Sequence, residues 1–262
     1  MRPAAVERRS ALAPARAAPQ VFRVRSVVLL LLTLAAPAAA QSIGVGVGPY
    51  SDPTHKVVGS GRMPAGWAMR FDPIVARAGR PAPAAPRRTD VDVQAVAGGV
   101  RVRSGPAAIY WRVSDVATGR FTVSATFTQT RGMAHEAYGL LVGGAHLDDG
   151  RERYLYFVVR PQDGGILVSR RTSDARPTAL VPWTVHPAVH RERAGDGAAT
   201  NRLAVRVGAD SVWFVANDRV VRALARAELR VPTDGVVGVR VNHNLDLLVT
   251  DLRVDQVSGH VR

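Results

Sequence analysis

The chain has 262 residues, with 35 lysines and arginines against 21 aspartates and glutamates, which gives a formal net charge of +14. It contains no cysteine, so disulfides, thiolate catalysis and cysteine-ligated metals are excluded. The basic residues are scattered singly along the chain, whereas nucleic-acid binding requires a basic stripe or patch. The composition therefore predicts no nucleic-acid partner, although the charge would attract an anionic glycan.

The N-terminal region has the features of an export signal. Arg23 and Arg25 precede the apolar run at residues 27–34, and small residues follow up to Ala40. This run is shorter than the ~20 apolar residues of a membrane-spanning helix, and the alanines match a cleavage site. We predict a signal peptide at residues 1–40, no transmembrane segment after its cleavage, and a secreted or periplasmic product.

The regions that flank the predicted domain differ from it in composition. Residues 1–20 make the basic part of the signal much longer than usual, so we expect an over-extended N-terminus, with translation starting near Val21 or Val24. Residues 41–66 are rich in glycine, serine and proline without periodicity, which predicts a flexible leader. Residues 258–262 are expected to form a C-terminal tail.

Residues 67–257 are predicted to form one all-β domain. Apolar and polar residues alternate with a period of two in short segments separated by turn residues, as in an antiparallel β-sandwich of jelly-roll type. In residues 121–128, for example, Phe121, Val123, Ala125 and Phe127 should point inward. After a first short piece at 67–72, we expect about eleven strands, at 91–95, 100–103, 121–128, 138–142, 154–160, 166–171, 203–207, 212–216, 220–224, 236–241 and 247–254.

Two local features set the expected pairing. A two-residue turn at residues 98–99 would place Ala95 opposite Val102 and leave a second, polar pair on the other face. That polar pair would be Gln94 and Arg103. The only helix candidate is short, at residues 222–229.

Several segments resemble the concanavalin A-like lectin/glucanase superfamily, and most closely its laminin G-like and 3-keto-disaccharide-hydrolase-like secreted bacterial proteins. The resemblance covers roughly residues 67–257 and implies two curved antiparallel sheets, but it does not imply one function, because this fold hosts many activities. The segments that carry it are FVANDRVV (214–221), TDGVVGVRVNHNLDLLVTDLRV (233–254), HEAYGLLVGG (135–144), YLYFVVRPQDGGILVSRR (154–171) and GRFTVSATF (119–127).

The carboxylates do not predict catalysis. Glycoside cleavage usually needs two flanking carboxylates, and the E-x-D-x-x-E motif of the laminarinase-type relatives is missing. Glu152 is expected in an exposed loop, so only Glu136, beside His135 at the head of a central strand, is well placed. The resemblance leaves open a hydrolase in which Glu136 or His135 is the general base, while a simple ion pair between Glu136 and an arginine is the alternative.

A polar cluster and one strand face are candidates for ligand binding. The segment RVNHNLD, at 240–246, can donate and accept hydrogen bonds in several directions, which suits sugar hydroxyls but equally suits a tight turn. In the strand at 154–160, one face carries Tyr154, Tyr156 and Arg160, which would stack on a sugar ring and bond to its oxygens. The alternative is that this face packs in the core and its arginine forms a surface ion pair. The candidate ligand-binding residues are His135, Glu136, Tyr154, Arg160, Arg240, Asn242, His243 and Asn244.

No cofactor or metal site is predicted. His186 and His190 have helical spacing, but Pro187 and strand-like neighbours argue against a helical zinc site. The two carboxylates of Asp148 and Asp149 are few for calcium. Trp183, in a loop-like stretch, is the tryptophan most expected to be exposed at a rim.

The preferred interpretation is a secreted or periplasmic protein that binds a saccharide, or an anionic glycan, without cleaving it. It predicts a concave groove in which six residues lie near one another, namely His135, Glu136, Arg160, Arg240, Asn242 and His243. The alternatives are the hydrolase described above and a structural, envelope-associated module with no small ligand.

Overall fold

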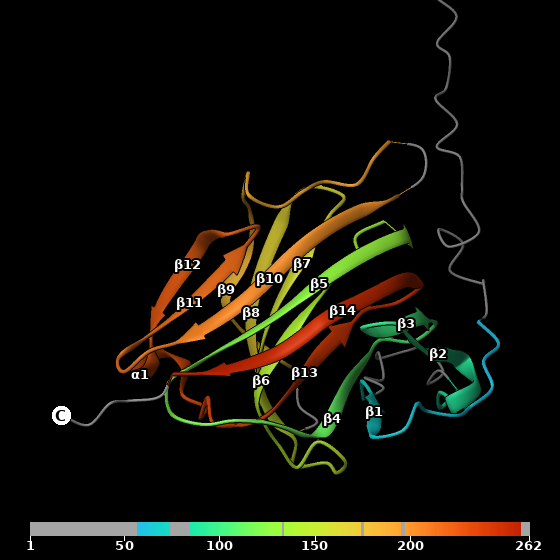
Figure 1. Ribbon diagram of the computed structural model, residues 1–262, viewed down its shortest axis with the longest axis horizontal. Helices are drawn as coiled ribbons and strands as arrows, with labels where there is room; N and C mark the ends of the chain where they lie inside the picture. The colour runs from blue at the N-terminus through green and yellow to red at the C-terminus, as the bar shows by residue number, and fades with distance from the viewer. Residues whose placement is uncertain (1–56, 74–83, 133, 174–175, 195–196, 258–262) are drawn as a thin grey trace, which may run out of the picture. The chain divides into compact units, whose positions relative to one another are not determined.

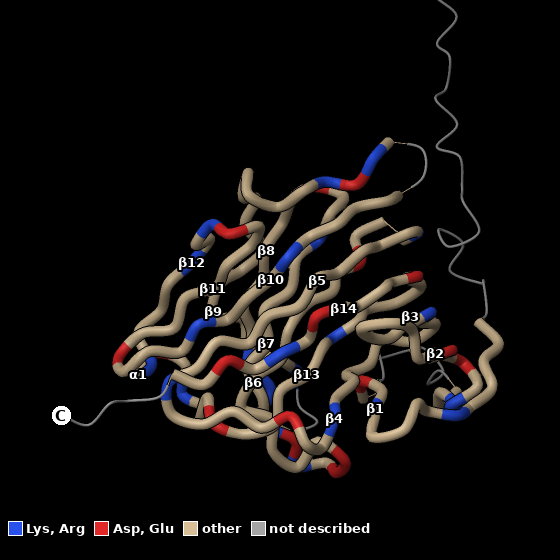
Figure 2. Tube along the Cα trace, in the orientation of Figure 1, with Lys and Arg blue, Asp and Glu red and all other residues tan. Residues whose placement is uncertain are grey.

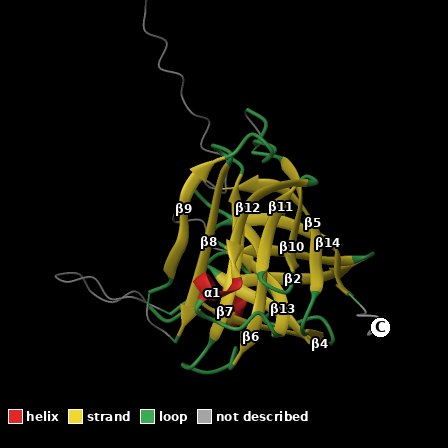
Figure 3. Ribbon diagram, turned by 90° about the vertical axis from the view of Figure 1, so that its left-hand side faces the viewer, coloured by secondary structure: helices red, strands yellow, loops and turns green. Residues whose placement is uncertain are grey.

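The computed structural model describes residues 57–73, 84–132, 134–173, 176–194 and 197–257. Within these residues the chain forms two antiparallel sheets of seven strands each, which confirms the predicted β-sandwich (Figures 1 and 3). Sheet A has the order β1 (Trp67–Phe71), β4 (Ala108–Ala117), β13 (Gly235–Val241), β6 (Tyr138–Ala145), β7 (Arg153–Arg160), β8 (Gly165–Thr172) and β9 (Thr178–Val185). Sheet B has the order β12 (Arg219–Ala225), β11 (Ser211–Ala216), β10 (Ala199–Val207), β5 (Phe121–Gly132), β14 (Leu245–Gln256), β3 (Gly99–Ser104) and β2 (Val91–Val96). A 3-10 turn, η1 (Arg88–Asp90), and one short helix, α1 (Arg226–Leu229), accompany them.

The main core lies between the sheets and follows the predicted alternation. Phe121, Val123, Ala125 and Phe127 of β5 are each at most 1% exposed, as expected. Phe127 stacks on Tyr138 of β6, with ring centroids 5.2 Å apart. Each such side chain contributes about 1.5–3 kcal/mol when it is fully buried, so these layers hold the sandwich together without disulfides.

The β2–β3 hairpin has a different register from the predicted one. Ala95 pairs with Val100 and not with Val102, because the two turn residues are Ala97 and Gly98, and not the two glycines. Gly98 has φ +73, the left-handed conformation that this turn requires. The predicted register is therefore wrong by two residues, a shift that keeps every side chain on its expected face.

Two strands of sheet A were not predicted. The first four residues of β4 are all buried, so they show no alternation. Strand β9 contains Pro182, which reads as a loop residue but is tolerated here because β9 is an edge strand. Trp183 follows on this edge and is 38% exposed, which confirms its predicted place at a rim.

The outward face of sheet A is concave. Four strands separate β1 from β8 in the sheet order, so a flat sheet would hold them roughly 24 Å apart. Asp72, directly after β1, nevertheless lies 3.8 Å from the guanidinium of Arg171 on β8. The sheet must therefore curl so that its two ends face one another across this side.

The predicted flanking regions are described only in part. Residues 57–66 of the predicted leader contact the sandwich, since Val57 is 7% exposed and the Gly59 N–H donates to the Thr89 carbonyl at 2.8 Å. The predicted signal peptide at 1–40 and the tail at 258–262 lie outside the described residues. In the part of the chain that is described, no helix has the length and apolar character needed to cross a membrane.

Candidate functional site

Glu136 and His243, two predicted ligand residues, meet at one end of sheet A. Glu136 precedes β6, and His243 lies in the turn after β13, the neighbouring strand. The Glu136 carboxylate accepts a hydrogen bond from the His243 main-chain N–H at 3.1 Å and lies 3.4 Å from the imidazole Nδ1. The predicted arginine partner of Glu136 is therefore replaced by a histidine.

This pair changes the acid–base behaviour of the histidine. The hydrogen bond with Glu136 is the largest influence and raises the pKa of His243, although partial burial acts in the opposite direction. The charges of Glu136 and Asp72 raise this pKa further, while Arg240 lowers it. The imidazole thus holds its proton to a higher pH than a free histidine.

Arg160 and Trp183 form a second exposed group at the same end of the sheet. The Arg160 guanidinium lies 4.3 Å from the centroid of the Trp183 ring and donates to Asp163 at 2.9 Å. This ion pair lowers the pKa of Asp163, because the side-chain hydrogen bond from Arg160 outweighs the opposing effect of burial. Gln162, in the β7–β8 turn, accepts a hydrogen bond at 2.9 Å from the main-chain N–H of His135.

The two groups lie on adjacent strand ends. The starts of β6 and β8 and the ends of β7, β9 and β13 fall at the same end of sheet A. The Asn242 N–H donates to the Ala137 carbonyl at 2.9 Å, which links β13 to β6. We call this region the strand-end surface and define it by Glu136, Arg160, Asp163, Trp183 and His243.

Asn242 and Asn244 take up turn positions. Asn244 has φ +49, is 6% exposed, and donates through its main-chain N–H to the Gly105 carbonyl at 3.0 Å. The Oδ1 atom of Asn242 is buried and has no hydrogen-bond partner among the described residues. Asn244 therefore has the role of a turn residue, which is one of the two predicted for this cluster. The side-chain oxygen of Asn242 has no hydrogen-bond donor among the described residues.

Arg240 and Tyr154 lie on the concave face, away from solvent. Arg240 is 7% exposed, forms a bidentate ion pair with Asp72, and stacks at 4.9 Å on the ring of Tyr156. Tyr154 is 1% exposed, and burial raises its pKa to about 12. Neither side chain is open to a sugar in this structure.

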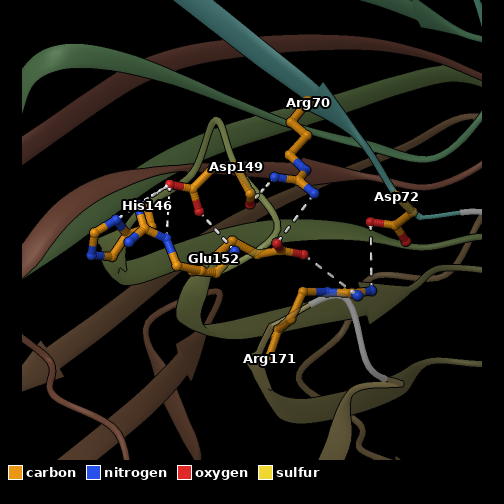
Figure 4. Close-up of polar contacts among 7 residues, drawn as sticks. Arg70, Asp72, His146, Asp149, Glu152 and Arg171 are labelled. Carbon is orange, nitrogen blue, oxygen red and sulfur yellow. Dashed lines mark hydrogen bonds and ion pairs between the residues drawn. The ribbon is translucent and has the colours of Figure 1, made fainter.

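The sequence did not reveal the ion-pair network to which Arg240 belongs. Figure 4 shows the part of it formed by Arg70, Asp72, Glu152 and Arg171. Arg171 of β8 lies 3.8 Å from Asp72 and 3.7 Å from Glu152, and Arg70 of β1 lies 3.3 Å from Glu152. Glu152 is 1% exposed, so its predicted place in an exposed loop is wrong. Arg70 lies in β1, and Asp72 follows this strand two positions later. The sequence gives no sign that their partners lie so far along the chain.

The network keeps Asp72 ionised. Burial by itself would raise the pKa of Asp72, but the charges and hydrogen bonds of Arg240, together with Arg171, outweigh it and lower the pKa below 3.8. The same pairing raises the pKa of Arg240 against the opposing effect of burial. Asp72 therefore acts as a fixed negative charge between two strands and cannot serve as a proton donor near neutral pH.

Among the described residues, packed side chains fill much of the concave face. A second apolar cluster occupies it, and its members Ile109, Trp111, Leu141, Tyr156 and Val158 are each at most 6% exposed. Two shallow clefts, of about 110 and 50 Å³, lie elsewhere, beside Trp67 and on sheet B. Of the predicted residues, the structure brings Glu136 and His243 into contact, places Arg160 on a nearby strand end, and buries Tyr154 and Arg240.

Comparison with solved structures shows what this fold is similar to. It resembles the carbohydrate-binding module CBM66 from Bacillus subtilis, with a TM-score of 0.51 and 12% identity over 73% of this chain and 96% of that chain. A Bacillus subtilis protein of unknown function with a galectin-like fold gives a TM-score of 0.48 and 11% identity over 72% and 89%. The exoplasmic/lumenal domain of VIP36, bound to Ca²⁺ and Man3GlcNAc, gives 0.47 and 11% over 79% and 90%.

At 11–12% sequence identity, these structures show a similarity of fold only. No protein-family model matches the sequence, and no match was found among curated protein sequences. The similarity to the first of these structures extends over nearly the full length of that module.

Proposed function

We propose that the protein binds a carbohydrate at the strand-end surface. The observation that carries this proposal is Trp183, an exposed indole on an edge strand that is held from one side by Arg160. Exposed aromatic rings offer apolar area to the faces of sugar rings. Lectin-like sandwiches such as CBM66 support the assignment, since that module is a carbohydrate-binding one.

The polar groups of the strand-end surface suit sugar hydroxyls. Asp163 and Glu136 are acceptors, Arg160 is a donor, and His243 is both a donor and an acceptor when its imidazole is neutral. A pocket for a small ligand combines an apolar surface with a few converging polar groups. We expect this surface to contact a few sugar units of a longer chain.

The test is calorimetric titration of the full chain with neutral oligosaccharides built from glucose, fructose or mannose. We expect Trp183→Ala to weaken binding by roughly tenfold or more, because the lost apolar contact is worth at least about 1.4 kcal/mol. Val185→Ala is the matched control, since Val185 is 56% exposed on the same strand. Equal loss in both variants, or no saccharide binding by the unmodified chain, would reject the proposal and favour a structural module.

The hydrolase alternative finds less support in this geometry. The carboxylate of Glu136 is engaged by both the main chain and the ring of His243. Asp72 shares the electrostatic environment of His243 but stays ionised beside Arg240, so it cannot supply the acid that glycoside cleavage needs. Binding is therefore the function that the strand-end surface supports best.

A further inference from the structure

The outward face of sheet B carries a row of hydroxyl groups. Because Phe121 and its alternate neighbours point into the core, the other residues of β5 point outward. On the neighbouring strand β10, Thr200 joins this row, and its hydroxyl donates to that of Thr128 at 3.1 Å. The outward residues of β5 are Thr122, Ser124, Thr126, Thr128 and Thr130.

Basic positions flank this row on neighbouring strands (Figure 2). Of the arginines on β3, β10 and β14, all but one pair with a carboxylate. On β10, Arg202 pairs with Asp218 at 2.9 Å, whereas Arg206 has no hydrogen-bond or ion-pair partner among the described residues. Arg206 is also exposed. The remaining pairs are Arg253 with Asp255 at 3.2 Å, Arg101 with Asp246 at 2.6 Å, and Arg103 with Asp92.

An exposed tryptophan stands directly beside the uncompensated arginine. Arg206 is in register with Trp213 on β11 and with Thr122 on β5. Trp213 is 37% exposed, and its ring rests against Gly208, where a Cβ atom would come within 2.7 Å of the indole. Glycine at this position thus lets the indole lie close to the backbone beside the arginine.

These groups border a shallow cleft of about 50 Å³. Its lining includes Thr122, Ser124 and Arg206, together with the neutralised pairs of Arg202 and Arg253. Three arginines against two aspartates leave one net positive charge, located at Arg206. A shallow surface with one free guanidinium, hydroxyls and an adjacent indole fits one acidic sugar unit of a chain that runs across the sheet.

We propose that the outward face of sheet B is a second carbohydrate site, one that binds an acidic polysaccharide. Arg206 forms a bidentate hydrogen-bonded pair with the carboxylate of one sugar unit, Trp213 contacts the face of a neighbouring ring, and the β5 hydroxyls bond to sugar oxygens. A nucleic acid would need several uncompensated cations in a row to match its phosphates, whereas among the described arginines of β3, β10 and β14 only Arg206 is uncompensated. The proposal does not depend on the strand-end surface.

The test is titration of the full chain with alginate oligosaccharides, whose units carry carboxylates, and with neutral glucose oligosaccharides for comparison. We expect Arg206→Gln to weaken alginate binding by roughly tenfold or more, the loss typical of a charge-assisted hydrogen bond. Trp213→Ala should weaken it as well. Arg88→Gln removes the same charge beyond the far edge of sheet B and should change the affinity less than roughly twofold, because exposed distant charges are screened.

Three outcomes would overturn this site. Equal losses in Arg206→Gln and Arg88→Gln would show only non-specific attraction to a basic protein. No alginate binding at low ionic strength would remove the ligand class, and displacement of alginate by a DNA oligonucleotide would indicate a nucleic-acid surface. Trp183→Ala should leave alginate binding unchanged, which separates a failure here from a failure at the strand-end surface.

Discussion

At the scale of single residues, the contact between Glu136 and His243 shows how one side chain changes the pKa of another. Their positions are 107 residues apart, yet the carboxylate meets both the main chain and the ring of the histidine. Because the hydrogen bond with Glu136 raises the pKa of His243, the protonated form of the histidine is favoured by folding. The pair therefore makes the stability of this corner depend on pH.

We expect the stabilisation from His243 to be fully present below about pH 6.5, the pKa of an unfolded histidine. It should be lost as the pH rises through the higher pKa of the folded state. Urea denaturation between pH 5.5 and 8.5 should show that the difference between the unmodified chain and His243→Gln shrinks towards alkaline pH. In the Glu136→Gln background, the effect of His243→Gln on the free energy of unfolding should no longer change with pH. If that effect does not change with pH in the unmodified chain either, the ion pair contributes nothing.

At the scale of elements, the hairpin between β11 and β12 shows how a local motif becomes tied to distant segments. Asn217 and Asp218, which join β11 to β12, have φ values of +48 and +65, the left-handed conformation that a two-residue type I′ turn requires. The Asn217 side chain also accepts from the Arg202 N–H at 2.9 Å and donates to the Ala188 carbonyl at 2.7 Å. The turn thus supports neighbouring segments as well as its own hairpin.

Asn217→Ala should lower the free energy of unfolding by about 2–3 kcal/mol, since it strains the left-handed backbone and removes the side-chain hydrogen bonds, which include one to Asn201. Asn217→Gly relieves the backbone strain but still lacks the hydrogen bonds, so it should lose roughly half as much. Urea denaturation measures both. Equal losses would mean that the backbone conformation at this position is unimportant.

At the scale of the whole sandwich, the network around Asp72 joins opposite ends of sheet A. Asp72 links β1 to β13 through Arg240 and to β8 through Arg171. Removing one partner of a buried ion pair leaves the other charge unpaired, which is costly. The curvature of sheet A therefore depends strongly on the carboxylate of Asp72, although this residue follows a strand of only five residues.

Asp72→Asn should lower the free energy of unfolding by about 3 kcal/mol at pH 7. Because the pKa of Asp72 is lowered in the folded state, its stabilising effect is present above about pH 3.8 and is lost as the pH falls through the lower folded pKa. The difference between variant and unmodified chain should therefore narrow in acid. Asp255→Asn, at an exposed pair, should cost less than about 1 kcal/mol, and a similar cost at both positions would argue against the network.

The sequence by itself determined the period of two, the turn residues and hence the β-sandwich, because alternation and turn chemistry are local properties of the chain. It also placed Glu136 and Arg160 at strand ends. It missed β4 and β9, whose buried run and Pro182 hide the alternation, and it put Glu152 at the surface. The tertiary structure alone decided that Asp72 meets Arg240, 168 positions away, and that packed side chains fill much of the concave face. Such contacts depend on which strands become neighbours and how far the sheet curls, and no short stretch of sequence encodes either.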